Sequence, residues 1–211
     1  MTQKGFYIDT TRCAGCRTCS VACADLNNTP VGLNLRRVVE YEGGEWKKNW
    51  DGTWRQNVFA YYVSMGCNEC ADPACVKVCP TKAHYKRAED GLVVIDTAKC
   101  IGCGACAAAC PYGAPQLDKV AKKMRKCDGC VARTSKGGQP VCVESCPERA
   151  LEFGDIEELR RKHGTLAAIA PLPSEEETHP LVVVELDGRR LCININDALS
   201  QGNIVSEYFK S

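Results

Sequence analysis

The sequence is poor in the large side chains that usually fill a protein interior. Its 211 residues include three Met, four Phe and three Trp. No stretch approaches the run of about 20 apolar residues that a membrane-spanning helix needs, and residues 1–9 lack the apolar segment of a secretory signal. We therefore expect a soluble chain whose interior is filled by something other than large side chains. Any attachment to a membrane is expected to be made through a partner.

An excess of charge of either sign is also missing. The 27 basic and 26 acidic residues leave a net charge of +1, so no global field favours nucleic acid or a membrane surface. The sequence contains no nucleophile–base pair, phosphate-binding loop or pair of carboxylates within a catalytic motif. We expect neither nucleic-acid binding nor catalysis by this chain.

Cysteine, by contrast, is abundant and clustered. Seventeen of the 211 residues are cysteine, about 8%, the level at which a disulfide or metal framework is expected. Sixteen of them form four groups of four: Cys13, Cys16, Cys19 and Cys23; Cys67, Cys70, Cys75 and Cys79; Cys100, Cys103, Cys106 and Cys110; and Cys127, Cys130, Cys142 and Cys146. The odd total and the missing secretory signal argue against a disulfide framework.

Two internal repeats interleave along the sequence. Residues 6–16 match residues 93–103, so groups one and three share a short strand followed by the spacing C-x2-C-x2-C-x3-C. Residues 73–80 match residues 140–147, so groups two and four share a C-x3-C-P ending. The order a-b-a-b predicts two modules, each built from one group of each kind.

The cysteine spacing is typical of iron–sulfur ligands. In a C-x2-C-x2-C run each short loop brings the next sulfur to a neighbouring iron of a compact cube, and the fourth cysteine turns toward a second cluster, as in bacterial ferredoxins. Prolines after Cys79, Cys110 and Cys146 redirect the backbone past the last ligand, whereas Cys23 is followed by alanine. A tetrahedral zinc site is the alternative, but three closely spaced cysteines do not suit it. We therefore predict that all sixteen grouped cysteines ligate iron in [4Fe–4S] clusters.

A segment without cysteine separates groups one and two. Residues 24–66 predict a β-hairpin that contains Trp46, Trp50 and Trp54. These aromatic side chains are expected to pack on the body of the protein, and the alternative is a docking surface for a partner. Further on, residues 86–91 end in Asp-Gly and predict a second hairpin turn.

The sequence after group four changes in character. Asp155 is expected to cap a helix that runs to His163, with Glu158 completing a capping box. Residues 170–177 indicate an exposed linker. The strand-like stretches that follow it, 181–186 and 191–195, are expected to offer too little apolar surface to hold the tail in place.

The remaining candidate ligands follow no metal-binding spacing. Cys192 lies in an alternating, strand-like stretch and is expected to be a small buried residue. His84, His163 and His179 are expected to be packed or solvated. The basic run 119–126 is expected to form a solvated face, although its charge next to group four would raise the potential of a cluster bound there.

Several stretches resemble a known family. The a-b-a-b order, together with residues 110–115, 126–130 and 141–147, resembles the iron–sulfur subunits of molybdopterin oxidoreductases. Residues 41–62 and 166–173 are similar to the electron-transfer subunit of membrane-bound anaerobic dimethyl sulfoxide reductase.

This resemblance implies an α+β fold of two nested bacterial-ferredoxin-like modules, each holding two clusters. The implied parts are an outer module from residues 1–23 and 111–154, a hairpin insert from 24–66, an inner module from 67–110, and a C-terminal helix with an extended partner-docking tail from 155–211.

The resemblance also implies which cysteines share a cluster. The first cluster would be held by Cys13, Cys16, Cys19 and Cys146, the second by Cys127, Cys130, Cys142 and Cys23, the third by Cys67, Cys70, Cys75 and Cys110, and the fourth by Cys100, Cys103, Cys106 and Cys79. Some relatives carry Trp in place of the second cysteine of group three and hold a [3Fe–4S] cluster there. This chain has Cys103, so four [4Fe–4S] clusters are expected.

The implied partners are a molybdopterin-containing catalytic subunit, next to the first cluster, and an integral membrane subunit that oxidises quinol, next to the fourth. The protein would then be peripheral on the cytoplasmic membrane, on its periplasmic face after export with the catalytic subunit. One alternative is the same relay subunit in a thiosulfate/polysulfide reductase or formate dehydrogenase complex. Two others are a free polyferredoxin and a structural zinc protein.

Overall fold

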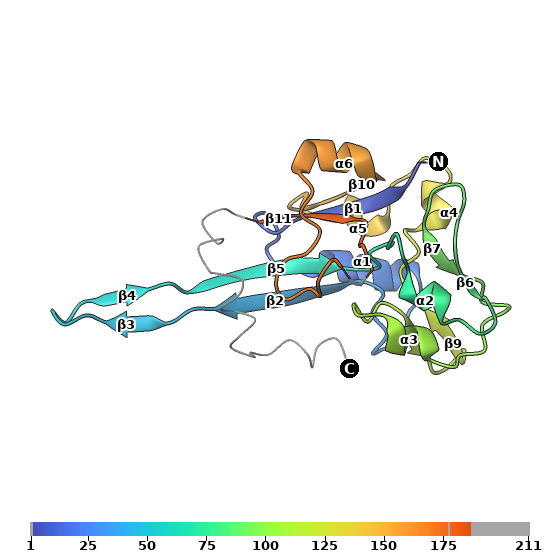
Figure 1. Ribbon diagram of the computed structural model, residues 1–211, viewed down its shortest axis with the longest axis horizontal. Coiled ribbons are helices and arrows are strands. Elements are labelled where there is room, and N and C mark those ends of the chain that lie inside the picture. Colours follow the sequence, from blue (N-terminus) through green and yellow to red (C-terminus); the bar gives the residue numbers. More distant parts are fainter. Residues whose placement is uncertain (1, 177, 187–211) are drawn as a thin grey trace.

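The computed structural model describes residues 2–176 and 178–186, and these form a body from which a long arm projects (Figure 1). Cys192 and the predicted strand 191–195 lie outside the described residues. Within the described ranges, no helix combines the length and the apolar character that crossing a bilayer requires.

Short strands and short helices alternate along the sequence. The strands are β1 (Lys4–Asp9), β2 (Arg37–Gly43), β3 (Trp46–Lys48), β4 (Trp54–Gln56), β5 (Phe59–Met65), β6 (His84–Lys86), β7 (Val93–Ile95), β8 (Gln116–Asp118), β9 (Lys123–Arg125), β10 (Leu151–Asp155) and β11 (Val182–Glu185). The helices are α1 (Thr18–Leu26), α2 (Ala74–Lys77), α3 (Ala105–Ala109), α4 (Val131–Thr134), α5 (Val141–Glu144) and α6 (Ile156–His163). This mixture confirms the α+β class.

The central sheet has the strand order β10-β1-β11, with β1 antiparallel to β10 and parallel to β11. Because side chains alternate between the faces of a strand, β1 serves two cores. Phe6 and Ile8 pack among the buried cysteines on one face. Tyr7 packs on the other face against Ile156 and Leu159 of α6, which covers the sheet (Figure 1).

The C-terminal segment 181–186 is part of this sheet. The three valines 182–184 of β11 are buried between α6 and the cysteine-rich core. The prediction of a tail with too little apolar surface is therefore wrong for this segment. The prediction of an exposed linker before it is only partly right, because Leu172 is buried whereas residues 174–176 are exposed.

Helix α6 begins and ends as its sequence predicts. The Asp155 carboxylate accepts hydrogen bonds from the backbone N–H groups of Glu157, at 3.0 Å, and Glu158, at 3.3 Å. This cap satisfies two of the free donors at the helix start. The Glu158 side chain lies 4.0 Å from Arg161 in an ion pair.

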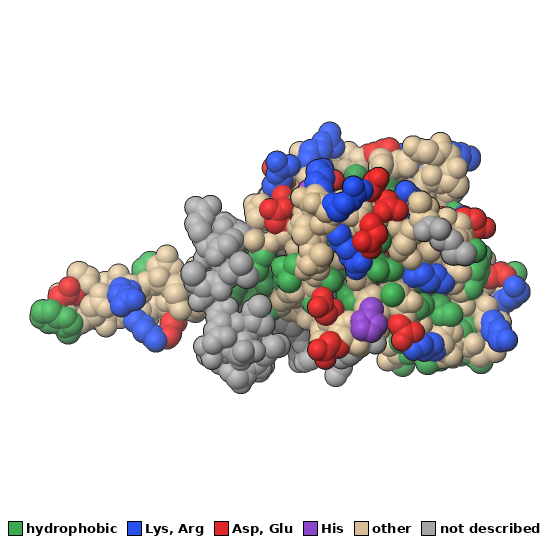
Figure 2. All heavy atoms as spheres, turned by 45° about the horizontal axis from the view of Figure 1, so that its top comes forward, with side chains coloured by type: hydrophobic (Ala, Val, Ile, Leu, Met, Phe, Trp, Pro, Cys, Tyr) green, Lys and Arg blue, Asp and Glu red, His purple; other side chains and the backbone are tan. Residues whose placement is uncertain are grey.

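The predicted hairpin between groups one and two is confirmed, and it divides into a buried base and an exposed arm. At the base, β2 pairs with β5, and Tyr61, Val63 and Met65 are buried in the body. Farther out, β3 pairs with β4 in the part we call the arm, residues 44–58. The arm extends away from the body and carries hydrophobic atoms at its tip (Figure 2).

The three tryptophans all lie on the arm and do not pack on the body. Trp46, Trp50 and Trp54 are 63%, 99% and 60% exposed. The expectation that these aromatic side chains serve burial is therefore wrong within the described residues. The tyrosines of the base carry that role, and Tyr61 is 4% exposed.

Strand pairing joins the cysteine groups in a nested order. Strand β1 precedes group one and pairs with β10, which follows group four; β7 precedes group three and pairs with β6, which follows group two. The same bond marks both pairs, because Asp9 N donates to Ala150 O and Asp96 N donates to Ala83 O, each at 2.8 Å. Helix α1 packs on α5, and α2 packs on α3. The predicted turn at residues 86–91 joins β6 to β7.

Candidate iron–sulfur sites

Two cavities in the body are each lined by four thiols. Cys13, Cys16, Cys19 and Cys146 line the first cavity. Cys67, Cys70, Cys75 and Cys110 line the second. Each set joins three cysteines of one group with the last cysteine of another, so each cavity is assembled from segments far apart in the sequence.

A third set of thiols meets between α1 and α5. Burial raises the pKa of Cys23 to about 12, and the neighbouring thiols of Cys127, Cys142 and Cys130 raise it further. Because like charges must be close to repel strongly, these four sulfurs lie around one region of the core. Cys23 is the only member that comes from the first cysteine group.

A fourth set lies beside β7 and β9. Burial raises the pKa of Cys106 to about 11, and the thiols of Cys100 and Cys103 contribute to the rise. Cys79, half-buried, packs against the apolar cluster that contains Cys100 and Cys106. Each of the sixteen predicted ligands therefore lies within or against one of four groupings of cysteines.

The four sets contact one another in a single order. Burial is the largest cause of the raised pKa values where the sets meet, and repulsion between thiols of different sets adds to it. These contacts join the thiols of Cys19 and Cys142, of Cys127 and Cys67, and of Cys75 and Cys106. The sets thus form a row, from the one lined by Cys13 to the one that contains Cys103.

Glycines allow the ligand loops to approach their neighbours closely. Gly15 and Gly102 hold equivalent positions in groups one and three, with φ of 71° and 70°. A Cβ at Gly15 would lie 2.7 Å from the Tyr62 ring, and one at Gly102 would lie 2.4 Å from the Lys122 carbonyl oxygen. Only glycine adopts this backbone without cost and leaves the space free.

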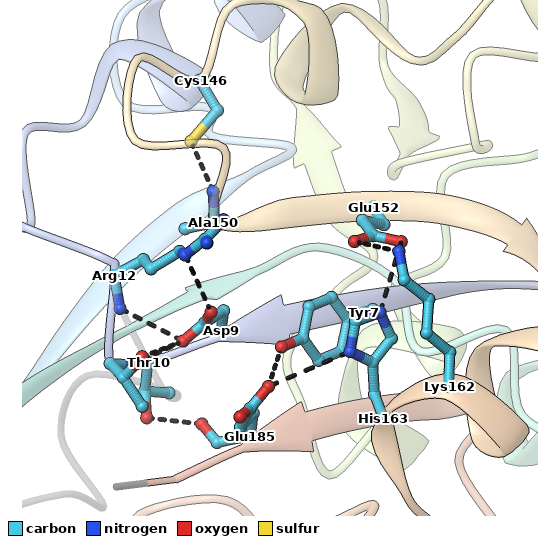
Figure 3. Close-up of polar contacts among 11 residues, drawn as sticks. Tyr7, Asp9, Thr10, Arg12, Cys146, Ala150, Glu152, Lys162, His163 and Glu185 are labelled. Carbon is cyan, nitrogen blue, oxygen red and sulfur yellow. Dashed lines mark hydrogen bonds and ion pairs between the residues drawn. The ribbon is translucent and has the colours of Figure 1, made fainter.

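Several sulfurs accept hydrogen bonds from nearby donors. Cys146 Sγ accepts from Ala150 N at 3.3 Å, beside the polar network of β1 (Figure 3). Cys100 Sγ accepts from Met124 N at 3.4 Å. Hydrogen bonds of this kind stabilise the anionic form of a bound thiolate and raise the potential of the cluster that it holds.

The donor sets fit iron–sulfur clusters. The sites bring together thiols that burial holds in the neutral form, as the raised pKa of Cys142, to about 11, illustrates. A group that binds there must supply positive charge and displace the thiol protons. Four thiols around one cavity are the donor set of a [4Fe–4S] cube. Within residues 2–176 and 178–186, no group of three or more His, Cys, Asp or Glu side chains is arranged to hold a single metal ion.

The prediction from sequence missed three charged residues buried among the thiols. Arg36 is 2% exposed, Glu69 is fully buried, and Lys126 is 6% exposed. The basic run 119–126 is solvated at Lys119 and Lys122, but its last member turns inward, contrary to expectation. No local pattern distinguishes Arg36 or Glu69, because their neighbours come from distant segments.

The fold and the thiol sets define a ferredoxin-like iron–sulfur protein, and the model of the 4Fe-4S dicluster domain matches residues 58–156. A probable anaerobic dimethyl sulfoxide reductase chain, YnfG, of Escherichia coli strain K12 is 58% identical over 87% of this chain and 89% of its own length. A chain of the anaerobic dimethyl sulfoxide reductase of the same strain is 55% identical over 87% and 89%. A chain of the polysulfide reductase of Wolinella succinogenes is 38% identical over 84% and 90%. This protein belongs to the family of the iron–sulfur subunits of anaerobic dimethyl sulfoxide reductases.

Proposed function

We propose that this chain is the electron-transfer subunit of a dimethyl sulfoxide or N-oxide reductase, and that it relays electrons through four [4Fe–4S] clusters. The observation that carries the proposal is the row of thiol sets, in which each set contacts the next through one pair of cysteines. When bound, such clusters take up and release single electrons. A row of buried sites through the body is the arrangement that a relay needs.

The proposed ligands follow the nested pairing. The first cluster is assigned to Cys13, Cys16, Cys19 and Cys146, the second to Cys23, Cys127, Cys130 and Cys142, the third to Cys67, Cys70, Cys75 and Cys110, and the fourth to Cys79, Cys100, Cys103 and Cys106. The two four-thiol cavities and the pairing of β1 with β10 and of β6 with β7 support this assignment. They also support an outer module of residues 1–23 and 111–154 around an inner module of 67–110.

The proposed partners stand at the two ends of the row. A molybdopterin-containing catalytic subunit is placed next to the first set, and a quinol-oxidising membrane subunit is placed next to the fourth, so that partners hold this protein at the periplasmic face of the membrane. The arm emerges beside the first set, because Val38 and Ser64 of its base line the same cavity as Cys13. The terminal substrate would be chosen by the catalytic subunit. The likeness to a polysulfide reductase chain therefore favours a second candidate, the same relay in a polysulfide reductase complex.

The direction of the relay is tested by Cys103→Trp in the assembled complex. Loss of this ligand should convert the fourth cluster to [3Fe–4S] with a markedly higher potential. Each 59 mV changes a one-electron equilibrium constant tenfold, so electrons from quinol should be trapped at this end. Quinol-driven turnover should collapse, whereas reduction by a dye that feeds the catalytic subunit directly should survive.

A matched control is Ile101→Trp, which puts the same side chain at an exposed position of the same loop. It removes no ligand and should retain four [4Fe–4S] signals in electron paramagnetic resonance spectra. If Cys103→Trp lost both activities equally despite normal assembly, or lost neither, the placement of the fourth cluster at the quinol end would be wrong.

A further inference from the structure

One buried cation in the body has no carboxylate partner among the described residues. Arg36 lies just before β2 and is 2% exposed. Its Nη1 donates to the Ser64 carbonyl oxygen and to the Ser64 hydroxyl, each at 3.0 Å, and its guanidinium carbon lies 4.6 Å from the centre of the Phe6 ring. No Asp or Glu of the described residues lies within 4.0 Å of it, and its Nε has no hydrogen-bond partner there. A buried charge without a counter-charge is strongly unfavourable.

Thiols surround this guanidinium instead. Burial lowers the pKa of Arg36, but the sulfurs of Cys142, Cys127, Cys19 and Cys23 outweigh it and raise the pKa. Gly66 leaves room for the approach, since a Cβ there would lie 3.3 Å from Arg36 Nη2 and 3.4 Å from Cys127 Sγ. Ser64 Oγ, which Arg36 contacts, also lies 3.2 Å from Cys19 Sγ. Neutral thiols cannot balance the cation, whereas thiolates bound to a cluster of net negative charge can.

We infer that Arg36 is the fixed counter-charge shared by the first and second clusters, and that it raises the potential of the second cluster more than that of the first. The inference rests on the proposed function. A nearby positive charge stabilises the reduced cluster, which carries one more negative charge than the oxidised one, and so raises its potential. Three of the four thiols that act on Arg36 belong to the second set, and Cys19 alone belongs to the first.

Lys126 offers a comparison on the other side of the second set. Its Nζ lies 3.4 Å from Cys67 Sγ and donates to the Cys127 carbonyl oxygen at 2.6 Å. Unlike Arg36, it has a carboxylate close by, because Glu69 Oε1 lies 4.0 Å from Nζ. That carboxylate offsets much of the lysine charge, so Arg36 is the cation whose field is least compensated among the described residues.

Redox titration of the loaded full chain, followed by electron paramagnetic resonance, tests the inference. Arg36→Gln removes the charge and keeps an amide donor, Arg36→Lys keeps the charge, and Arg17→Gln removes an exposed arginine beside Cys16. Arg36→Gln should lower the reduction equilibrium constant of the second cluster at least tenfold, which is about 59 mV. The first cluster should shift less, and the third and fourth should stay within about twofold. Arg36→Lys should retain most of the wild-type value, and Arg17→Gln should change little because water screens its charge.

Equal shifts at all four clusters, no shift at any, or a loss in Arg36→Lys as large as in Arg36→Gln would overturn the inference. If Arg36→Gln binds no second cluster, Arg36→Lys decides. Loading with a potential near that of the wild type supports the role of the charge, and failure to load contradicts it. The iron content and spectra of the wild-type chain distinguish the two levels. A wild type without four clusters defeats the proposed function, whereas unshifted variants of a four-cluster chain defeat the Arg36 inference alone.

Discussion

The body and the arm are parts of one polypeptide, yet they bury their side chains by different rules. In the body, cysteines and small residues surround sites that side chains alone do not fill, and charges such as Arg36 lie among thiols. In the arm, which has no cysteine, the largest side chains face outward. The comparison indicates that the body is fitted to a bound inorganic group and the arm to another protein. Each region therefore depends on something that the chain itself does not encode.

The largest expected difference between the two regions follows removal of the clusters. Because ligand binding and folding are coupled at such sites, oxidation with chelation should abolish the cooperative unfolding transition of the body. Hydrogen exchange should accelerate by orders of magnitude in β1, which is buried among the cysteines. The arm, residues 44–58, should exchange rapidly before and after. Retained protection of β1 in the iron-free chain would break the comparison.

A single ligand should show that the body is divided into separate sites. Cys23→Ser should disturb the second cluster, because the Cys23 thiol faces Cys127 and Cys142, while the first cluster stays close to normal. Electron paramagnetic resonance spectra of the reduced chain report both. Ser20→Ala on the same helix is the control, since its hydroxyl is buried without a hydrogen-bond partner among the described residues. Spectra in which the first cluster is lost and the second is kept would refute the nested pairing.

The same substitution in the two regions should have unequal costs. Val63 is fully buried at the hairpin base, and Val58 is 48% exposed on the arm. Val63→Ala should lower the free energy of unfolding of the loaded chain by about 1.5–3 kcal/mol, whereas Val58→Ala should change it by no more than about 0.5 kcal/mol. Anaerobic denaturant titration measures both. Equal costs would mean that the arm packs as the body does.

The smallest effect on the chain itself is expected at the tip of the arm. Trp50→Ala should change the free energy of unfolding by no more than about 0.5 kcal/mol, because the side chain is 99% exposed. Its affinity for the catalytic subunit should fall about tenfold or more, because an exposed tryptophan is the kind of residue that anchors an interface. Val31→Ala, an equally exposed residue of the body, is the control. Unchanged association would remove the proposed role of the arm.

Local signals predicted what depends on neighbours in sequence. The cysteine spacing, the Asp155 cap and the Asp-Gly turn each involve residues a few positions apart, and the cap and the turn are confirmed in the structure. The three consecutive valines 182–184 are typical of a strand buried on both faces, and this signal could have identified β11. The burial of Arg36 could not have been foreseen, because Ser64, Cys142 and Cys127 reach it from distant segments.

The account stands most directly on the metal content of the purified chain. Four complete sets of thiols should hold about sixteen iron and about sixteen acid-labile sulfide per chain in a brown protein. Metal and sulfide analysis of anaerobically purified protein, with zinc measured in the same sample, decides the matter. Iron and sulfide near these values would support four [4Fe–4S] clusters, and stoichiometric zinc with little iron would contradict the whole account.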